Sequence, residues 1–201
     1  MLYRSYLELQ QYRDAERLTE KRLKQFPAEL FVYVDQGMIY ERKGEPKKAA
    51  KVFDKGIDKI GFDSKQTGDL ALAFENCNHP EYALKTYLSA REKMRNKFVY
   101  VGEVATLYQR MGNYEAMMQE YFDLLDNSPG MMSSIQLSMQ RVLADASSPV
   151  VADGLRSALI QRVQQHPENK YYLEMMIWFS LQQKDFRFAM EQAQAVDARF
   201  P

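Results

Sequence analysis

The chain has 201 residues, of which 46% are hydrophobic and 27% are charged, and no long apolar run interrupts it. This composition is typical of a folded globular protein and argues against a disordered or membrane-spanning chain. The 27 basic and 27 acidic residues give a net charge of zero, so a general attraction to nucleic acid is not expected. The single cysteine, Cys77, excludes an internal disulfide framework.

A spacing of about 34 residues, which we call the period, recurs through the first half of the chain. Alanine keeps this spacing at Ala15, Ala49 and Ala83. Aromatic residues keep the same spacing at Tyr6, Tyr40, Phe74 and Tyr108. Between these positions, apolar residues follow the three- and four-residue intervals of amphipathic helices, with turn residues between the helices. The pattern predicts a succession of helical pairs, each with the same internal layout.

The second period, with Gly37, Tyr40, Gly44, Ala49 and Phe53, shows the layout most fully. A small residue, a tyrosine, an alanine and an aromatic in this order resemble the tetratricopeptide repeat family, and the resemblance extends over essentially the whole chain. It implies an all-α fold, namely a right-handed α-α superhelix, or solenoid, of about six helix-turn-helix repeats. In this fold the first helix of each pair is helix A and the second is helix B.

The six expected repeats can be placed in chain order. They cover residues 1–29, 30–63, 64–97, 98–131, 132–169 and 170–201. Pro129 and Pro167 lie farther apart than one period, so the fifth repeat contains about four extra residues. The segment 144–153, ADASSPVVAD, has the composition of a loop, and we expect an enlarged turn there. Because solenoid repeats contact only their neighbours, the chain is predicted to be a single domain. The last predicted B helix lacks the polar character of a capping helix, so the chain is also predicted to be a stretch of a longer repeat protein.

Residue patterns typical of catalysis are not found in the sequence. The two histidines, His79 and His166, do not fall at metal-ligand spacing with other candidate ligands. The nine glycines are scattered over turn and helix positions rather than gathered in a phosphate-binding loop. We therefore predict no enzyme activity, no metal site and no cofactor. The sequence assigns no cellular compartment.

In tetratricopeptide proteins the A helices line a concave groove, and the resemblance implies which residues of this chain would face a ligand. They are Phe31, Val34, Asp35, Met38, Glu41, Lys65, Asp69, Leu72, Glu75, Val99, Glu103, Thr106 and Gln109, with Tyr171 and Trp178 from the sixth repeat. One acid recurs in each of three repeats, at Asp35, Asp69 and Glu103, beside an apolar stripe. Alternatively, these acids only solvate the groove and pair with Arg42 and Arg110.

The groove positions indicate a ligand class. Relatives that bind acidic chaperone tails carry a lysine and an asparagine where this chain has Val34 and Met38, so the resemblance gives no expectation of such a ligand here. The predicted function is a non-catalytic scaffold or adaptor that binds a basic or amphipathic peptide or helix. Two alternatives remain open: a regulatory or substrate-recruiting arm of a larger enzyme or assembly, and a module that forms homo-oligomers end to end through uncapped terminal repeats. We expect neither a nucleic-acid partner nor a transmembrane segment.

A ladder of lysines stands on the predicted B helix of the second repeat. It consists of Lys47, Lys48, Lys51, Lys55 and Lys59. Asp54 and Asp58 lie among them at helical spacing. The ladder is predicted to be a solvated outer face, with a specific anionic contact as the alternative.

Overall fold

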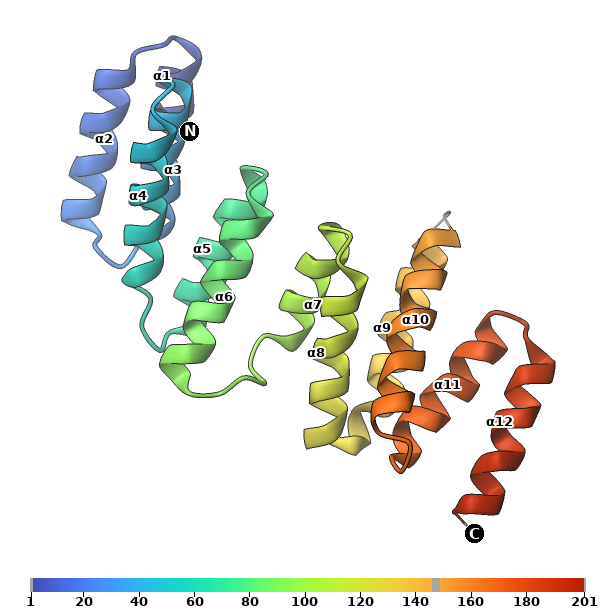
Figure 1. Ribbon diagram of the computed structural model, residues 1–201. Helices are drawn as coiled ribbons and strands as arrows, with labels where there is room; N and C mark the ends of the chain where they lie inside the picture. Colours follow the sequence, from blue (N-terminus) through green and yellow to red (C-terminus); the bar gives the residue numbers. More distant parts are fainter. Residues whose placement is uncertain (1, 146–148, 201) are drawn as a thin grey trace. The chain divides into compact units, whose positions relative to one another are not determined.

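The computed structural model describes residues 2–145 and 149–200, and every regular element in these ranges is helical. The helices are α1 (Leu2–Glu8), α2 (Tyr12–Gln25), α3 (Phe31–Arg42), α4 (Pro46–Asp58), α5 (Ser64–Asn76), α6 (Pro80–Met94), α7 (Val101–Arg110), α8 (Tyr114–Asn127), the 3-10 turn η1 (Pro129–Met131), α9 (Met132–Asp145), α10 (Pro149–Gln165), α11 (Lys170–Gln182) and α12 (Phe186–Arg199). Figure 1 shows them following one another as helical pairs. The predicted all-α architecture of helix-turn-helix repeats is confirmed.

The chain forms two compact units, Met1–Leu107 (unit 1) and Tyr108–Pro201 (unit 2), with the boundary inside α7. In unit 1 each A helix packs on its own B helix in the pairs α1/α2, α3/α4 and α5/α6, and α3 also packs on α1 and α5. The B helices α4 and α6 pack on each other. In unit 2, α8 packs on α10, and α11 packs on α9, α10 and α12. The prediction of a single domain stays a prediction.

The B helices begin in strict register. Their first residues in the first four repeats are Tyr12, Pro46, Pro80 and Tyr114, each one period after the last. Proline suits the first turn of a helix because that turn leaves its backbone N–H groups unbonded and because the ring presets φ. The helix starts therefore reproduce the period seen in the sequence.

The turns between A and B helices repeat with the same period. Gln10, Gly44, Asn78 and Gly112 all have positive φ angles, between 58° and 75°, and occupy the same position in successive repeats. In each turn the amide one residue later donates to the carbonyl five residues back, as from His79 to Phe74 at 2.9 Å. This is the hydrogen bond of a Schellman cap, which needs a left-handed residue where glycine and asparagine are least strained.

The predicted enlarged turn at 144–153 is wrong. Helix α9 runs to Asp145 and α10 begins at Pro149, so most of the segment is helical. Residues 146–148 lie outside the described part of the chain. The extra residues of the fifth repeat lengthen α10 to 17 residues, against 13 to 15 in α2, α4, α6 and α8. Proline at a first helical position is as consistent with a helix start as with a loop, which explains the error.

The core of unit 1 centres on Phe53, which is 1% exposed. Its ring lies so close to Gly37 that a Cβ atom there would be 2.0 Å from the Phe53 Cε1 atom. The ring also meets Phe74 and Tyr82 of the third repeat, with centroids 5.3 Å and 4.9 Å away. Phe53 thus joins helices α3 and α4 within one repeat and contacts both helices of the next.

A lysine from the third repeat closes the end of α4. The Lys93 ammonium donates to the carbonyl oxygens of Asp58 at 2.7 Å and Ile60 at 2.9 Å. Carbonyls in the last turn of a helix lack partners within the helix, so a positive group there is stabilising. The contact holds repeats two and three together at the ends of their B helices.

In unit 2 a polar cluster joins α8, α10 and α11. The Arg162 guanidinium donates to the Asp126 carboxylate at 2.8 Å and stands over the ring of Tyr172, 5.1 Å from its centroid. The Tyr172 hydroxyl also donates to Asp126. Burial of Tyr172, together with its hydrogen bond to the charged Asp126, raises the pKa of the phenol to about 12. The cluster fixes the angle between three helices with charge-assisted hydrogen bonds.

Candidate functional site

Unit 1 holds most of the residues implied to face a ligand. Among them Leu72 is 54% exposed, while Phe31 and Met38 are half-buried. On the same A helices, Asp35, Glu41, Asp69 and Glu75 are half-buried and Lys65 is exposed, and on α7 Glu103 and Thr106 are exposed. We call this set, carried by α3, α5 and the unit 1 part of α7, the A-helix face. Its exposed and half-buried side chains are available to a partner.

Two of the implied residues occupy other surroundings. Val34 is fully buried in the core of unit 1, so its side chain has no surface to offer a ligand. Val99 lies in the loop before α7 rather than on an A helix, and its carbonyl accepts a hydrogen bond from the Arg91 Nε atom at 2.8 Å. The positive φ of Tyr100, 59°, separates Val99 from the first turn of α7.

A pocket opens where the C-terminal ends of α3 and α5 meet α1. Its volume is about 350 Å³, and its lining residues are Tyr3, Leu7, Glu8, Met38, Arg42, Asn76, Cys77 and Asn78. The side chains of Leu7 and Met38 are apolar, whereas Arg42 and the two asparagines offer hydrogen-bond donors. We call it the α1–α3–α5 pocket. It can hold an apolar side chain beside a polar group.

A second pocket lies at the N-terminal ends of α3 and α5. It has a volume of about 230 Å³ and is lined by Ala28, Glu29, Leu30, Phe31, Asp63, Lys65, Gln66 and Asp69. The Arg22 guanidinium covers the Phe31 ring at 5.3 Å from its centroid and bonds Glu29 at 2.6 Å. We call it the α3–α5 pocket. It brings together three of the implied residues, Phe31, Lys65 and Asp69.

The acidic residues of the A-helix face have partners within the chain. Asp69 accepts a hydrogen bond from Lys65, and Glu41 lies 3.1 Å from the Nε2 atom of His79. Asp35 and Glu75 also have partners. Lys65 and His79 were not among the cations expected to pair with these acids. The exposed carboxylate of Glu103 differs from them in that no partner for it is found among the described residues.

His79 joins two repeats at the edge of this face. Its ring nitrogens lie 3.1 Å from the carboxylates of Glu41 on α3 and Glu81 on α6. Its ring also lies 5.3 Å from that of Phe53. Burial lowers the pKa of His79, but the hydrogen bonds and charges of Glu81 and Glu41 outweigh it, so the pKa lies above the ordinary 6.5. The protonated ring therefore links α3 to α6.

The interaction of the protonated His79 ring with Glu41 and Glu81 predicts a pH dependence of stability. Because the pKa is raised in the folded state, the stabilisation is complete below about 6.5 and is lost as the pH rises through the folded value. We expect His79→Gln to cost about 1–2 kcal/mol near pH 6 and less near pH 8, as measured by urea unfolding. His166→Gln, at the half-buried second histidine, is the matched control and should show no such difference between the two pH values. An equal cost of His79→Gln at both pH values would contradict the assignment.

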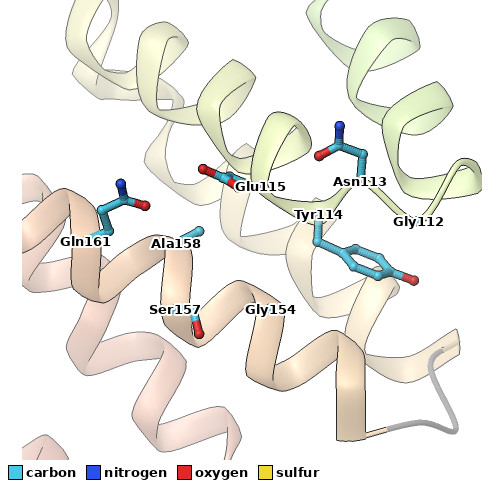
Figure 2. A pocket seen from close by; sticks show the side chains of 8 residues that line it. All are labelled: Gly112, Asn113, Tyr114, Glu115, Gly154, Ser157, Ala158 and Gln161. Atoms are coloured by element: carbon cyan, nitrogen blue, oxygen red, sulfur yellow. The ribbon is translucent and has the colours of Figure 1, made fainter.

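The other implied residues lie in unit 2. Gln109 is half-buried in the last turn of α7, and on α11 Tyr171 is 40% exposed and Trp178 is half-buried. A separate pocket of unit 2, shown in Figure 2, lies between the start of α8 and the side of α10 and has a volume of about 350 Å³. It is lined by Gly112, Asn113, Tyr114, Glu115, Gly154, Ser157, Ala158 and Gln161. Sequence reasoning missed it, although the small residues of α10 recur there at helical spacing.

Within the described ranges 2–145 and 149–200, no group of three or more histidine, cysteine, aspartate or glutamate residues could hold a metal ion. In the same ranges, no helix has the length and apolar character needed to cross a membrane.

Comparisons with known proteins add two distant structures. No protein-family model and no curated protein matches the chain. The crystal structure of MamA is 13% identical, with a TM-score of 0.37, and the match covers 100% of this chain and 98% of that one. A Podosopora anserina putative kinesin light chain with nearly identical TPR-like repeats is 14% identical, with a TM-score of 0.35, covering 98% and 92%. The regular register of the helix starts and of the Schellman turns shows a protein built from repeated helix-turn-helix pairs.

Proposed function

We propose that the protein is a non-catalytic interaction scaffold or adaptor that binds a peptide or helix on the A-helix face of unit 1. The observation that supports this most is the pair of pockets at the two ends of α3 and α5. Phe31 in one pocket and Arg42 in the other are the first and last residues of α3. Their separation corresponds to about 16 Å along the helix, which three turns of a partner helix or about five residues of an extended peptide can span.

The chemistry of the face favours an amphipathic partner. Met38, Leu72 and Phe31 offer apolar contacts, and such side chains supply most of the binding energy in peptide grooves. Asp69 and Glu41 already have partners, so a strongly basic ligand would have to displace Lys65 and His79. A partner with one apolar stripe and a single basic group opposite Glu103 can bind without displacing Lys65 or His79 from their carboxylates.

The test is affinity capture from native extract followed by identification of the retained proteins by mass. Leu72→Asp places a charge in the middle of the face, at a side chain exposed enough to change without loss of folding. We expect the retention of a partner that the wild-type chain binds to fall by about tenfold or more in this variant. The triple change Asp35→Asn, Asp69→Asn and Glu103→Gln should weaken retention less.

A matched control changes charge in unit 2. The variant Arg141→Gln, Lys170→Gln and Lys184→Gln alters exposed residues of that unit and should retain the same partner as the wild type. If Leu72→Asp and the control retain every partner equally well, the A-helix face is not the recognition surface. Circular dichroism of each variant separates lost binding from lost folding.

A second candidate function, self-association, has one observation in its favour. Leu181, Phe186 and Met190 on α11 and α12 are 46%, 64% and 61% exposed. Large apolar side chains exposed together mark interaction surfaces. If copies of the chain associate there, light scattering over a dilution series should show a mass that falls with dilution in the wild type and stays monomeric in Phe186→Asp. A strict monomer at high concentration would exclude this candidate.

A further inference from the structure

The B helices of the first two repeats carry a dense positive surface away from the A-helix face. Its members are Arg13, Arg17, Lys21 and Lys24 on α2, and Lys47, Lys51, Lys55 and Lys59 on and directly after α4. All eight of these residues are exposed. We call this set the basic face. The residues through which each helix packs into the core, such as Ala15 on α2 and Ala49 on α4, lie on the opposite side of the helix from these cations.

The basic face follows the period of the repeat. Arg13 and Lys47 are equivalent positions one period apart, and the same holds for Arg17 and Lys51 and for Lys21 and Lys55. At 3.6 residues per turn, the cations of α2 fall within an arc of about 80° and those of α4 within about 120°. Since α2 and α4 occupy the same place in successive repeats, the two arcs face the same way and form parallel rows.

Most acids beside these rows are engaged with other groups. The Glu16 carboxylate on α2 accepts from Lys43 at 2.7 Å, and Asp54 on α4 accepts from Lys85 at 2.8 Å. No ion-pair partner is found among the described residues for Arg13, Lys47 and Lys51. The Arg17 guanidinium lies 3.9 Å from the Asp14 carboxylate, so the charge of this member is partly offset. The cations at Arg13, Lys47 and Lys51 keep the face positive.

The helical-pair fold does not require these cations. At the positions equivalent to Arg13, Arg17 and Lys21, helix α8 carries Glu115, Gln119 and Asp123. Helix α8 nevertheless forms and packs as a B helix in unit 2. The positive charge of α2 and α4 is thus not needed for the helices to fold and pack.

We propose that the basic face docks an acidic α-helix of another protein. Cations four residues apart on a helix stand about 6 Å apart along its axis, which is the spacing of carboxylates four residues apart on a partner helix. Helices α2 and α4 both pack on α3, so the two rows belong to neighbouring repeats of one unit.

The composition of the face favours a protein helix over the other anionic partners. Interleaved acids such as Glu20 and Asp58 would oppose the uniformly negative backbone of a nucleic acid or the surface of an anionic membrane. No large apolar or aromatic side chain stands exposed on α2 or α4 in the described ranges to stack on bases or enter a bilayer. A helix of mixed composition can place its carboxylates opposite the cations alone.

The test uses a labelled, alanine-rich synthetic peptide of about 20 residues with glutamate at every fourth position, so that the acids form one stripe. Binding is measured by fluorescence anisotropy at low and at physiological salt. We expect the striped peptide to bind the wild type more tightly than a peptide of the same composition with scattered acids, and binding to weaken with salt. The variant Arg13→Gln, Lys47→Gln and Lys51→Gln should bind about tenfold more weakly.

A matched variant in unit 2, Arg141→Gln, Lys170→Gln and Lys184→Gln, makes the same change of net charge and should bind the striped peptide as the wild type does. Equal binding of striped and scattered peptides, or equal loss in both variants, would overturn the proposal. Tighter binding of a duplex oligonucleotide or of phosphatidylserine vesicles, lost in the basic-face variant, would also overturn it. Leu72→Asp should leave this binding unchanged, so the result is independent of the proposed function of the A-helix face.

Discussion

Replacing Gly37 with alanine is expected to lower the free energy of unfolding of unit 1 by about 3 kcal/mol. The new Cβ atom would stand 2.0 Å from Cε1 and 2.7 Å from Cζ of Phe53. The Phe53 ring cannot move aside, because it is 1% exposed and packs against Phe74 and Tyr82. Either α3 and α4 separate or the aromatic contacts to the next repeat are lost. Urea unfolding followed by circular dichroism measures the effect.

Two other helical glycines give the control. Nothing lies within 4 Å of a Cβ atom built at Gly68 or Gly102. Alanine is a better helix former than glycine, so Gly68→Ala should be neutral or stabilise by up to about 1 kcal/mol. Adding Phe53→Leu to Gly37→Ala should recover part of the loss, since the smaller side chain leaves room for the methyl group. A Gly37→Ala chain as stable as Gly68→Ala would contradict the packing described for α3 and α4.

Phe53→Ala is expected to cost about 3–5 kcal/mol, the usual cost of removing a buried phenylalanine from a core. The loss is at the high end of that range because the ring contacts Gly37 in its own repeat and Phe74, Tyr82 and His79 in the next. The exposed Phe62→Ala is the matched control and should change stability by less than about 0.5 kcal/mol.

The effect of Phe53→Ala should also be local. In a repeat protein each repeat contacts only its neighbours, so a lost core side chain loosens its own repeat and those beside it. We expect amide hydrogen exchange to speed up in α3, α4, α5 and α6. Fluorescence of the single tryptophan, Trp178 in unit 2, should show a smaller shift of its unfolding midpoint. Equal loss of protection throughout both units would count against a nearest-neighbour architecture.

The fold could be predicted because its determinants are local. Gly44, Asn78 and Gly112 stand where a left-handed residue ends helix A, and Pro46 and Pro80 stand where helix B begins. Each of these residues acts through its own backbone angles, and so its role can be read without knowing what lies nearby. The prediction failed at 144–153 for the same reason, since a proline there was taken as part of a loop rather than as the first residue of α10.

The candidate site could be predicted only in part. The family positions led to Phe31, Met38 and Asp69, which the structure places in or beside two pockets. They also led to Val34, which is fully buried, because family positions give the side of a helix but not the depth of packing. The partners of the acids, among them His79 for Glu41, join residues 38 positions apart and depend on how consecutive repeats stack.

The sequence by itself determined the period and the succession of helical pairs with turn residues between them, since these depend on residues close together in the chain. Only the tertiary structure decided which equivalent positions are interchangeable. Ala71 stands one period after Gly37, and the sequence pattern treats the two as the same small residue. Gly37 nevertheless has no room for a methyl group, because the distance between α3 and α4 is set by the Phe53 ring and by the repeat against which that ring packs.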